Sequence, residues 1–275
     1  MTPESIHAAV LGLVQGLCEF LPVSSSGHLA LAQALYGFGE PEVFFDLVLH
    51  LGTLLAVCVF YRREVTGMVW ELRRLARPSE LKVSYRVRPA FRLGVLIVLG
   101  SIPTAAIGLF FEGFLTSLFS SLKAVGIGFL ASVLVLACSK FFKNAVYKSE
   151  LEFPAWAALV IGASQGIAIA PGISRSGMTI CVALMLGLEG SLAARYSFLL
   201  SVPAILGGLI LKLHEADAST FPASAAAIGF GVSAVSGFLA LALLTFIVNR
   251  KRFHYFAPWC LAAALLAFHL FSKGM

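Results

Sequence analysis

The sequence predicts an all-α polytopic membrane protein in which six transmembrane helices and two re-entrant helical hairpins form an inverted-topology repeat. The first observation is composition: of 275 residues, 59% are hydrophobic and 12% are charged. Because a water-exposed surface usually has about a quarter to a third of its residues charged, a soluble globular protein is excluded. The second observation is a set of long apolar runs separated by short basic gaps, and the third is a pair of matched polar breaks.

The apolar runs predict the spans, since a transmembrane helix needs about 20 mostly apolar residues. Six stretches meet this requirement: 43–61, 92–111, 115–139, 192–211, 222–248 and 253–272. Two further apolar regions, 5–38 and 155–190, are interrupted midway by the polar runs PVSSSGH (22–28) and PGISRSGMT (171–179). Irregular backbone is tolerated inside a bilayer only where protein or trapped water covers it. We therefore interpret both regions as re-entrant hairpins.

The charged gaps predict the orientation of the spans. Residues 62–92 hold nine Arg or Lys against three Glu, 140–152 hold three Lys against two Glu, and 250–252 are all basic, whereas 212–220 hold one Lys against two acidic residues. Basic gaps stay on the cytoplasmic side, so the first three are expected inside and the last outside, with both termini external. The net charge of +6 is explained by these gaps, and no nucleic-acid partner is expected.

A shift of 150 positions aligns the two interrupted regions without gaps. Eight identities fall in a 28-residue window, where chance would supply about two; they pair Val10, Gly12, Gln15, Gly16, Ser24, Ser26, Gly27 and Gly37 with Val160, Gly162, Gln165, Gly166, Ser174, Ser176, Gly177 and Gly187. An odd number of spans separates the copies, so the second enters from the opposite side. We expect a single membrane domain, 1–275, with repeats 1–145 and 151–275, whose broken helices form a polar site near mid-bilayer.

Glu19 is the first candidate catalytic residue. An ionisable carboxylate at membrane depth is costly enough to need a partner or a cation, although a snorkelling interfacial side chain is the alternative. Gln15 lies one helical turn earlier on the same face, so Glu19 and Gln15 are the candidate metal ligands. If a second carboxylate were needed to hold a metal, Gln15 would not provide it.

Ser24, Ser25 and Ser26 follow a proline and precede an apolar helix. This pattern leaves hydroxyls and unpaired backbone N–H groups at a helix N-terminus, where an anion is favoured; a plain helix cap is the alternative. His28 lies three residues beyond Ser25 and shares its helix face. The combination of Ser25, His28 and Glu19 matches the nucleophile, base and orienting group of a catalytic site.

The second polar break supplies the complementary charge. Arg175 is flanked by Ser174 and Ser176 and followed by Thr179, and a guanidinium binds phosphate oxygens in a bidentate manner. The alternative is a buried ion pair between Arg175 and Glu19 without any ligand. Taken together, both breaks predict a phosphate site, with the flanking hydroxyls as phosphate-binding groups, rather than a sodium or proton relay.

At this point the motifs become recognisable. The run from Gln15 to His28, QGLCEFLPVSSSGH, and the run from Pro171 to Thr179, PGISRSGMT, closely resemble the two signature motifs of the bacterial undecaprenyl-diphosphate phosphatase family, the integral-membrane bacitracin-resistance type. The resemblance covers the whole chain in length, span layout and motif spacing. It implies hydrolysis of undecaprenyl diphosphate to undecaprenyl phosphate and inorganic phosphate, which recycles the lipid carrier for peptidoglycan and other cell-wall polymers.

The resemblance also implies a divalent cation, Mg²⁺ or Ca²⁺, a location in the bacterial plasma (inner) membrane, and an active site open to the periplasmic or external side. Its catalytic residues correspond to Glu19, Ser25, His28 and Arg175, and its second motif to Ser174 and Thr179 as well. Gln15 stands where many members have Glu, which puts a two-carboxylate metal site in question. The partners are the polyprenyl diphosphate and membrane lipid, and a homodimer is left open.

Three routes for the chemistry remain open from the sequence. Ser25 activated by His28 attacks the distal phosphorus, or His28 itself attacks, or His28 oriented by Glu19 deprotonates a water. The rival function is a secondary transporter or flippase for a lipid phosphate or another anion, because inverted repeats with broken helices are the usual anatomy of carriers.

Overall fold

The computed structural model describes residues 3–36, 43–71, 73–74, 78–141, 145–213 and 222–274. Within these ranges the chain is helical, and the one β-type contact is an isolated bridge between Tyr147 and Leu188. The predicted all-α class is confirmed. Gly37 and residues 214–220, which entered the predicted repeat and the predicted external gap, lie outside the described residues.

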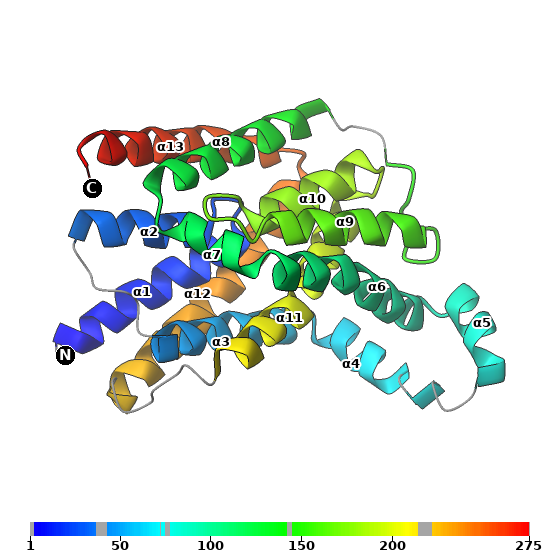
Figure 1. Cartoon of the computed structure of the whole chain (residues 1–275). Helices are drawn as coiled ribbons and strands as arrows, with labels where there is room; N and C mark the ends of the chain where they lie inside the picture. The colour runs from blue at the N-terminus through cyan, green and yellow to red at the C-terminus, as the bar shows by residue number, and fades with distance from the viewer. Residues whose placement is uncertain are drawn as a thin grey trace.

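The helices follow one another through short turns (Figure 1). The predicted first repeat, residues 1–145, contains α1 (Pro3–Phe20), α2 (Ser25–Tyr36), α3 (Val43–Phe60), α4 (Arg62–Glu71), α5 (Pro78–Val87), α6 (Pro89–Phe110), α7 (Glu112–Phe119), α8 (Leu122–Cys138) and the short η2 (Ser139–Phe141). The second contains α9 (Ala155–Ile167), α10 (Arg175–Met185), α11 (Gly190–Lys212), α12 (Ala223–Asn249), η4 (Phe253–Phe256) and α13 (Ala257–Ser272).

Five helical segments of the described chain are long and apolar enough to cross a membrane. They are Pro89–Phe110, Leu122–Phe141, Gly190–Lys212, Ala223–Asn249 and Phe253–Ser272. A sixth span exists if α3 and α4 are counted together, but these two helices are bent by 83° against each other. The protein is therefore a multi-pass membrane protein with five or six candidate spans.

The predicted span 115–139 is broken in the structure. Residues 112–119 form the separate helix α7, and α8 begins at Leu122. The reason is local: Ser121 has an extended backbone, and its hydroxyl accepts a hydrogen bond from the backbone N–H of Ala124 at 3.3 Å. A side-chain cap of this kind satisfies an N–H group that would otherwise have no partner in the first turn.

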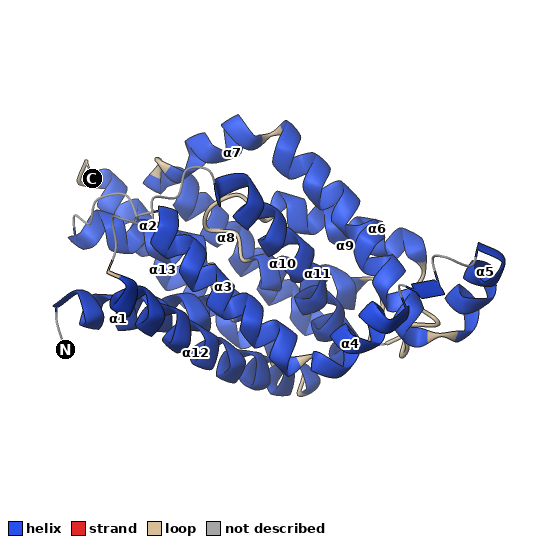
Figure 2. Ribbon diagram, turned by 90° about the horizontal axis from the view of Figure 1, so that it is seen from below, coloured by secondary structure: helices blue, strands red, loops and turns tan. Residues whose placement is uncertain are grey.

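The two interrupted regions enter the bundle from opposite ends. Figure 1 shows α1 and α2 running from the end that carries both termini to the middle of the molecule, whereas α9 and α10 reach the middle from the other end. Helices α4 and α5, which lie in the basic segment 62–92, project from the end away from the termini (Figure 2).

Glycines allow the first helix of each pair to pack very closely on a long helix. A Cβ atom on Gly12 of α1 would lie 2.6 Å from the carbonyl oxygen of Gly229 in α12. A Cβ atom on Gly162 of α9 would lie 1.9 Å from the carbonyl oxygen of Gly100 in α6. Small residues let helix backbones approach in this way inside membranes. Thus α1 is fixed to α12 and α9 to α6, which positions the polar turns that follow them.

Candidate active site

The two polar turns meet in the middle of the bundle. The first turn, residues 21–24, lies between α1 and α2, and the second, residues 168–174, lies between α9 and α10. The hydroxyl of Ser176 donates a hydrogen bond to the backbone carbonyl of Leu21 at 3.3 Å. The predicted contact between segments about 150 residues apart is therefore present in the structure.

Glu19 and Arg175 form a salt bridge across this contact. Glu19, in the last turn of α1, is buried, and one of its carboxylate oxygens accepts a hydrogen bond from Nη2 of Arg175. The other terminal nitrogen of the guanidinium, Nη1, is buried and has no hydrogen-bond partner among the described residues. A buried donor without a partner costs about 1–3 kcal/mol. This half of the guanidinium is therefore prepared to bind an additional anionic group.

The second carboxylate oxygen of Glu19 is also engaged. It accepts hydrogen bonds from the side-chain amide of Gln15 at 3.0 Å and from the hydroxyl of Ser25 at 3.2 Å. The structure thus brings together four of the residues that the sequence singles out: Gln15, Glu19, Ser25 and Arg175. A carboxylate that accepts a hydrogen bond from a serine fixes the orientation of that hydroxyl.

Ser24 and Ser174 occupy equivalent positions as helix caps. The hydroxyl of Ser24 accepts a hydrogen bond from the backbone N–H of Gly27 at 3.2 Å, and that of Ser174 accepts one from Gly177 at 3.1 Å. The cap is the expected bond for serine at the first position before a helix. Both hydroxyls are therefore committed to the backbone, in agreement with the plain-cap alternative.

The other predicted phosphate-binding hydroxyls have partners of their own. Ser26 lies 3.4 Å from the hydroxyl of Ser24, and Ser176 lies 3.3 Å from that of Ser174. Thr179 donates to the backbone carbonyl of Arg175 at 2.8 Å and also contacts the hydroxyl of Ser197 in α11. Within the described part of the chain, Thr179 forms no hydrogen bond with the side chain of Glu19 or Arg175.

The hydrogen bonds of His28 among the described residues go to groups other than Ser25 and Glu19. Its Nδ1 lies 2.8 Å from the backbone carbonyl of Ser24, and its Nε2 lies 3.0 Å from the indole nitrogen of Trp259 in α13. The imidazole also packs edge-on against Phe129 of α8 at 5.3 Å between ring centres. Of the predicted group of three, Ser25 and Glu19 are hydrogen-bonded to each other, while the histidine bonds to other elements.

Ser132 of α8 contacts the second turn, and the sequence does not reveal this contact. Its hydroxyl accepts a hydrogen bond from the backbone N–H of Ser174 at 2.8 Å and donates one to the carbonyl of Gly172 at 3.0 Å. Gly172 has a φ of +83°, and a Cβ atom there would lie 2.2 Å from the carbonyl oxygen of Val125. Helix α8 therefore holds the second turn directly before Arg175. A single serine in an apolar run carries no sequence signal for this role.

The ligands available for a cation are few. Among the residues that the structure describes, no group of three or more His, Cys, Asp or Glu side chains could hold a metal ion. Mg²⁺ commonly binds through one or two carboxylates together with substrate phosphates and water. Glu19, with the amide of Gln15 beside it, fits this pattern when phosphate oxygens complete the coordination.

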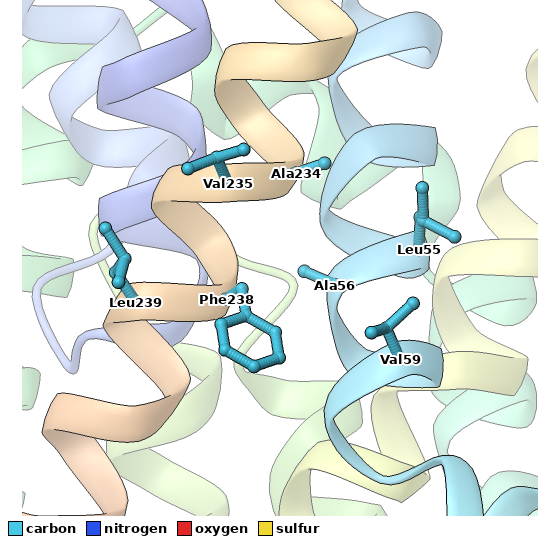
Figure 3. Close-up of a pocket in the computed structure, with 7 residues that line it drawn as sticks. All are labelled: Leu55, Ala56, Val59, Ala234, Val235, Phe238 and Leu239. Carbon is cyan, nitrogen blue, oxygen red and sulfur yellow. The ribbon is translucent and has the colours of Figure 1, made fainter.

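A separate hollow in the described structure is lined by none of these residues. It has a volume of about 260 Å³ and is formed between α3 and α12 (Figure 3); its lining residues are Leu55, Ala56, Val59, Ala234, Val235, Phe238 and Leu239. Every lining side chain is apolar, and several are exposed on the outer surface of the bundle. Phosphate chemistry needs polar or charged groups, so this hollow is not the active site.

Residues 8–266 match the family described as bacitracin resistance protein BacA. The chain belongs to the BacA family. The matched range includes both polar motifs, and the resemblance seen in the sequence is thereby confirmed.

Relatives of similar length support the BacA assignment. A protein of Desulforapulum autotrophicum is 44% identical over 269 residues, which cover 96% of this chain and 97% of the relative. A protein of Desulfatibacillum aliphaticivorans is 41% identical over 262 residues, covering 93% and 94%, and one of Syntrophotalea carbinolica is 41% identical over 264 residues, with the same coverage. Each of the three is named undecaprenyl-diphosphatase.

Proposed function

We propose that this protein hydrolyses undecaprenyl diphosphate to undecaprenyl phosphate and inorganic phosphate. The observation that carries the proposal is the buried guanidinium of Arg175, which gives one nitrogen to Glu19 and keeps Nη1 without a partner. A terminal phosphate oxygen would supply the missing acceptor. The names of the BacA-family relatives support the same substrate. Recycling of the lipid carrier for cell-wall synthesis would be the biological consequence.

In the proposed reaction, Arg175 holds the distal phosphate and Ser25 attacks its phosphorus. The hydrogen bond from Ser25 to Glu19 supports this choice of nucleophile, since the carboxylate can orient the hydroxyl and accept its proton. Undecaprenyl phosphate leaves. Water then cleaves the phosphoserine and gives its proton to His28, while Glu19 returns its proton to the departing oxygen of Ser25. Phosphoryl transfer depends mainly on positioning and charge neutralisation, which Arg175 and the oriented hydroxyl provide.

The divalent cation, Mg²⁺ or Ca²⁺, is part of the same proposal. Glu19 and Gln15 would hold it together with oxygens of the diphosphate, and when bound it would neutralise charge on those oxygens. Because Glu19 is a single carboxylate whose oxygens already accept hydrogen bonds, we expect the cation to bind only together with the substrate.

The proposed topology has six crossings, α3, α6, α8, α11, α12 and α13. The pairs α1–α2 and α9–α10 would be re-entrant hairpins that enter from opposite sides, as broken helices do in inverted repeats. Helices α4 and α5 belong to the basic segment 62–92 and lie at the end away from the termini (Figure 2), which supports external termini and an active site open to the external side of the inner membrane.

The test is release of phosphate from undecaprenyl diphosphate by the purified protein in detergent, with Mg²⁺ or Ca²⁺ added. Arg175→Ala should reduce the rate at least about 100-fold, as removal of a charge-stabilising donor commonly does. Arg74→Ala is the matched control, because Arg74 is a similarly buried arginine that is also ion-paired, to Glu71 and Glu80. Absence of phosphate release by the unmodified protein would refute the proposal.

A transporter or flippase of lipid phosphates is the second candidate. It is favoured by the meeting of two broken helix pairs from opposite ends of the bundle (Figure 1). A carrier needs two compartments and would release no phosphate in detergent. Movement of a labelled lipid phosphate across reconstituted vesicles, without hydrolysis, would support this function instead.

A further inference from the structure

Both ring nitrogens of His28 are hydrogen-bonded, and the two partners define where the proton lies. The backbone carbonyl of Ser24, 2.8 Å from Nδ1, can only accept a hydrogen bond. The indole N–H of Trp259, 3.0 Å from Nε2, can only donate one. Nδ1 therefore carries the proton, and Nε2 carries the lone pair. A protonated imidazole would have no acceptor for the indole.

Trp259 reaches His28 from an element far away in the sequence. The indole and imidazole rings are stacked, with 6.2 Å between their centres and an angle of 18° between their planes. The next residue, the fully buried Cys260, contacts the backbone carbonyl of Pro22 at 3.4 Å between sulfur and oxygen. Two consecutive residues of α13 thus contact the first turn and its histidine. The buried Cys260 fixes the backbone beside Trp259, and this places the indole next to His28.

The surroundings of His28 leave Trp259 as its only polar side-chain partner among the described residues. Helix α8 presents Phe129 to the ring, helix α13 presents Trp259, and its own turn presents the carbonyl of Ser24. None of these groups is charged or titratable near neutral pH, and no described charged side chain is hydrogen-bonded to the imidazole.

We propose that Trp259 is a positioning residue for His28, which holds the imidazole neutral and makes Nε2 its only basic atom. The inference rests on the proposed function, in which His28 accepts a proton from the hydrolytic water. Trp259 lies outside both sequence motifs. Its indole would release Nε2 to that water while the carbonyl of Ser24 keeps the proton on Nδ1.

The test variant is Trp259→Phe, which keeps an aromatic ring but removes the N–H donor. Because the residue is 60% exposed, the exchange should leave the packing of α13 intact. Without the donor, the midpoint of the His28 titration should rise by about half to one pH unit. It can be followed by NMR of protein labelled with ¹⁵N in its histidine rings, where His28→Asn identifies the signal. The acid limb of the pH–rate profile should move by the same amount.

Trp156→Phe is the matched control, since Trp156 is a 54% exposed tryptophan on α9 away from His28. It should change neither measurement. An unchanged His28 midpoint in Trp259→Phe would overturn the inference, because a purely structural tryptophan would not affect the titration. Absence of phosphate release by the unmodified protein would instead refute the proposed function, and the NMR titration would still report on the bond to Trp259.

Discussion

The Glu19–Arg175 pair is a buried ion pair and at the same time an incomplete site for an anion. A buried ion pair can satisfy both charges without any ligand, and the salt bridge does satisfy Glu19. The guanidinium has more donors than one carboxylate oxygen can use, however, and Nη1 stays unpartnered. The pair is therefore stable enough to exist in the resting protein and still incomplete without an anion.

Gln15 offers a test of the cation at this site. Gln15→Glu would place a second carboxylate about 3 Å from Glu19, where two like charges are held together best by a cation. More ligand charge raises affinity, so the concentration of Mg²⁺ or Ca²⁺ for half-maximal phosphate release should fall by about tenfold. This half-maximal concentration is measured by titrating the cation in the phosphate-release assay. Gln15→Leu should not lower this concentration, and an unchanged value for Gln15→Glu would argue against a cation beside Glu19.

Single residues differ in how well the sequence reveals them. Glu19 and Arg175 stand out because a charge in an apolar run needs a partner, and the structure pairs them. The partner of His28 could not be predicted, since Trp259 is 231 positions away and resembles any interfacial tryptophan of a spanning helix. Only the packing of α13 on the first turn brings the two together.

Helix α8 supports the second turn through Ser132, and a substitution of Ser132 tests this support. In Ser132→Ala, the N–H of Ser174 and the carbonyl of Gly172 lose their side-chain partner. We expect a loss of about 1–3 kcal/mol in the free energy of unfolding. Phosphate release should also fall about tenfold or more, since small displacements of a positioning group are costly. Unfolding in detergent and turnover measure the two effects.

Ser139→Ala is the matched control, because Ser139 is a serine at the start of η2, directly after α8. Ser139 is also buried, but its hydroxyl donates to the carbonyl of Leu136 one turn earlier. Its loss should leave turnover unchanged. Equal effects of the two substitutions would mean that α8 contributes general packing and no specific support of the turn.

At the scale of helices, apolar length predicts the spans well and their interruptions poorly. The predicted spans 192–211 and 222–248 agree with α11 and α12 within two residues at each end. The break before α8 was missed because it depends on two serines within an apolar run, where hydropathy barely changes. The predicted span 43–61 agrees with α3, and the 83° bend to α4 falls at its predicted end.

In the whole molecule, helices of one predicted repeat pack mainly against helices of the other. Helix α1 lies along α12, α9 lies along α6, and α8 packs against α13. In each case one helix comes from residues 1–145 and the other from 151–275. The repeat itself remains a prediction from the sequence, but an exchange of helices between halves is what antiparallel duplicates are expected to form.

This interlocking predicts that neither half folds alone, although the two can assemble. Chains 1–145 and 146–275, made separately, should be degraded or aggregate, because the close contacts of Gly12 with Gly229 and of Gly162 with Gly100 would be lost. Made together, they should copurify and release phosphate, since Glu19 comes from the first chain and Arg175 from the second. Copurification through a tag on one chain, followed by the phosphate-release assay, measures both properties.

The same pair of chains provides its own control. Arg175→Ala in the second chain should abolish phosphate release and leave copurification unchanged, because its salt bridge to Glu19 is a single contact beside the packing of α1 on α12, α9 on α6 and α8 on α13. Stable, monodisperse behaviour of either chain alone would contradict the interlocked packing. Copurification without turnover by the unsubstituted pair would mean instead that an intact connection is needed to align the two polar turns, whose correct meeting brings the carboxylate and the guanidinium into one site.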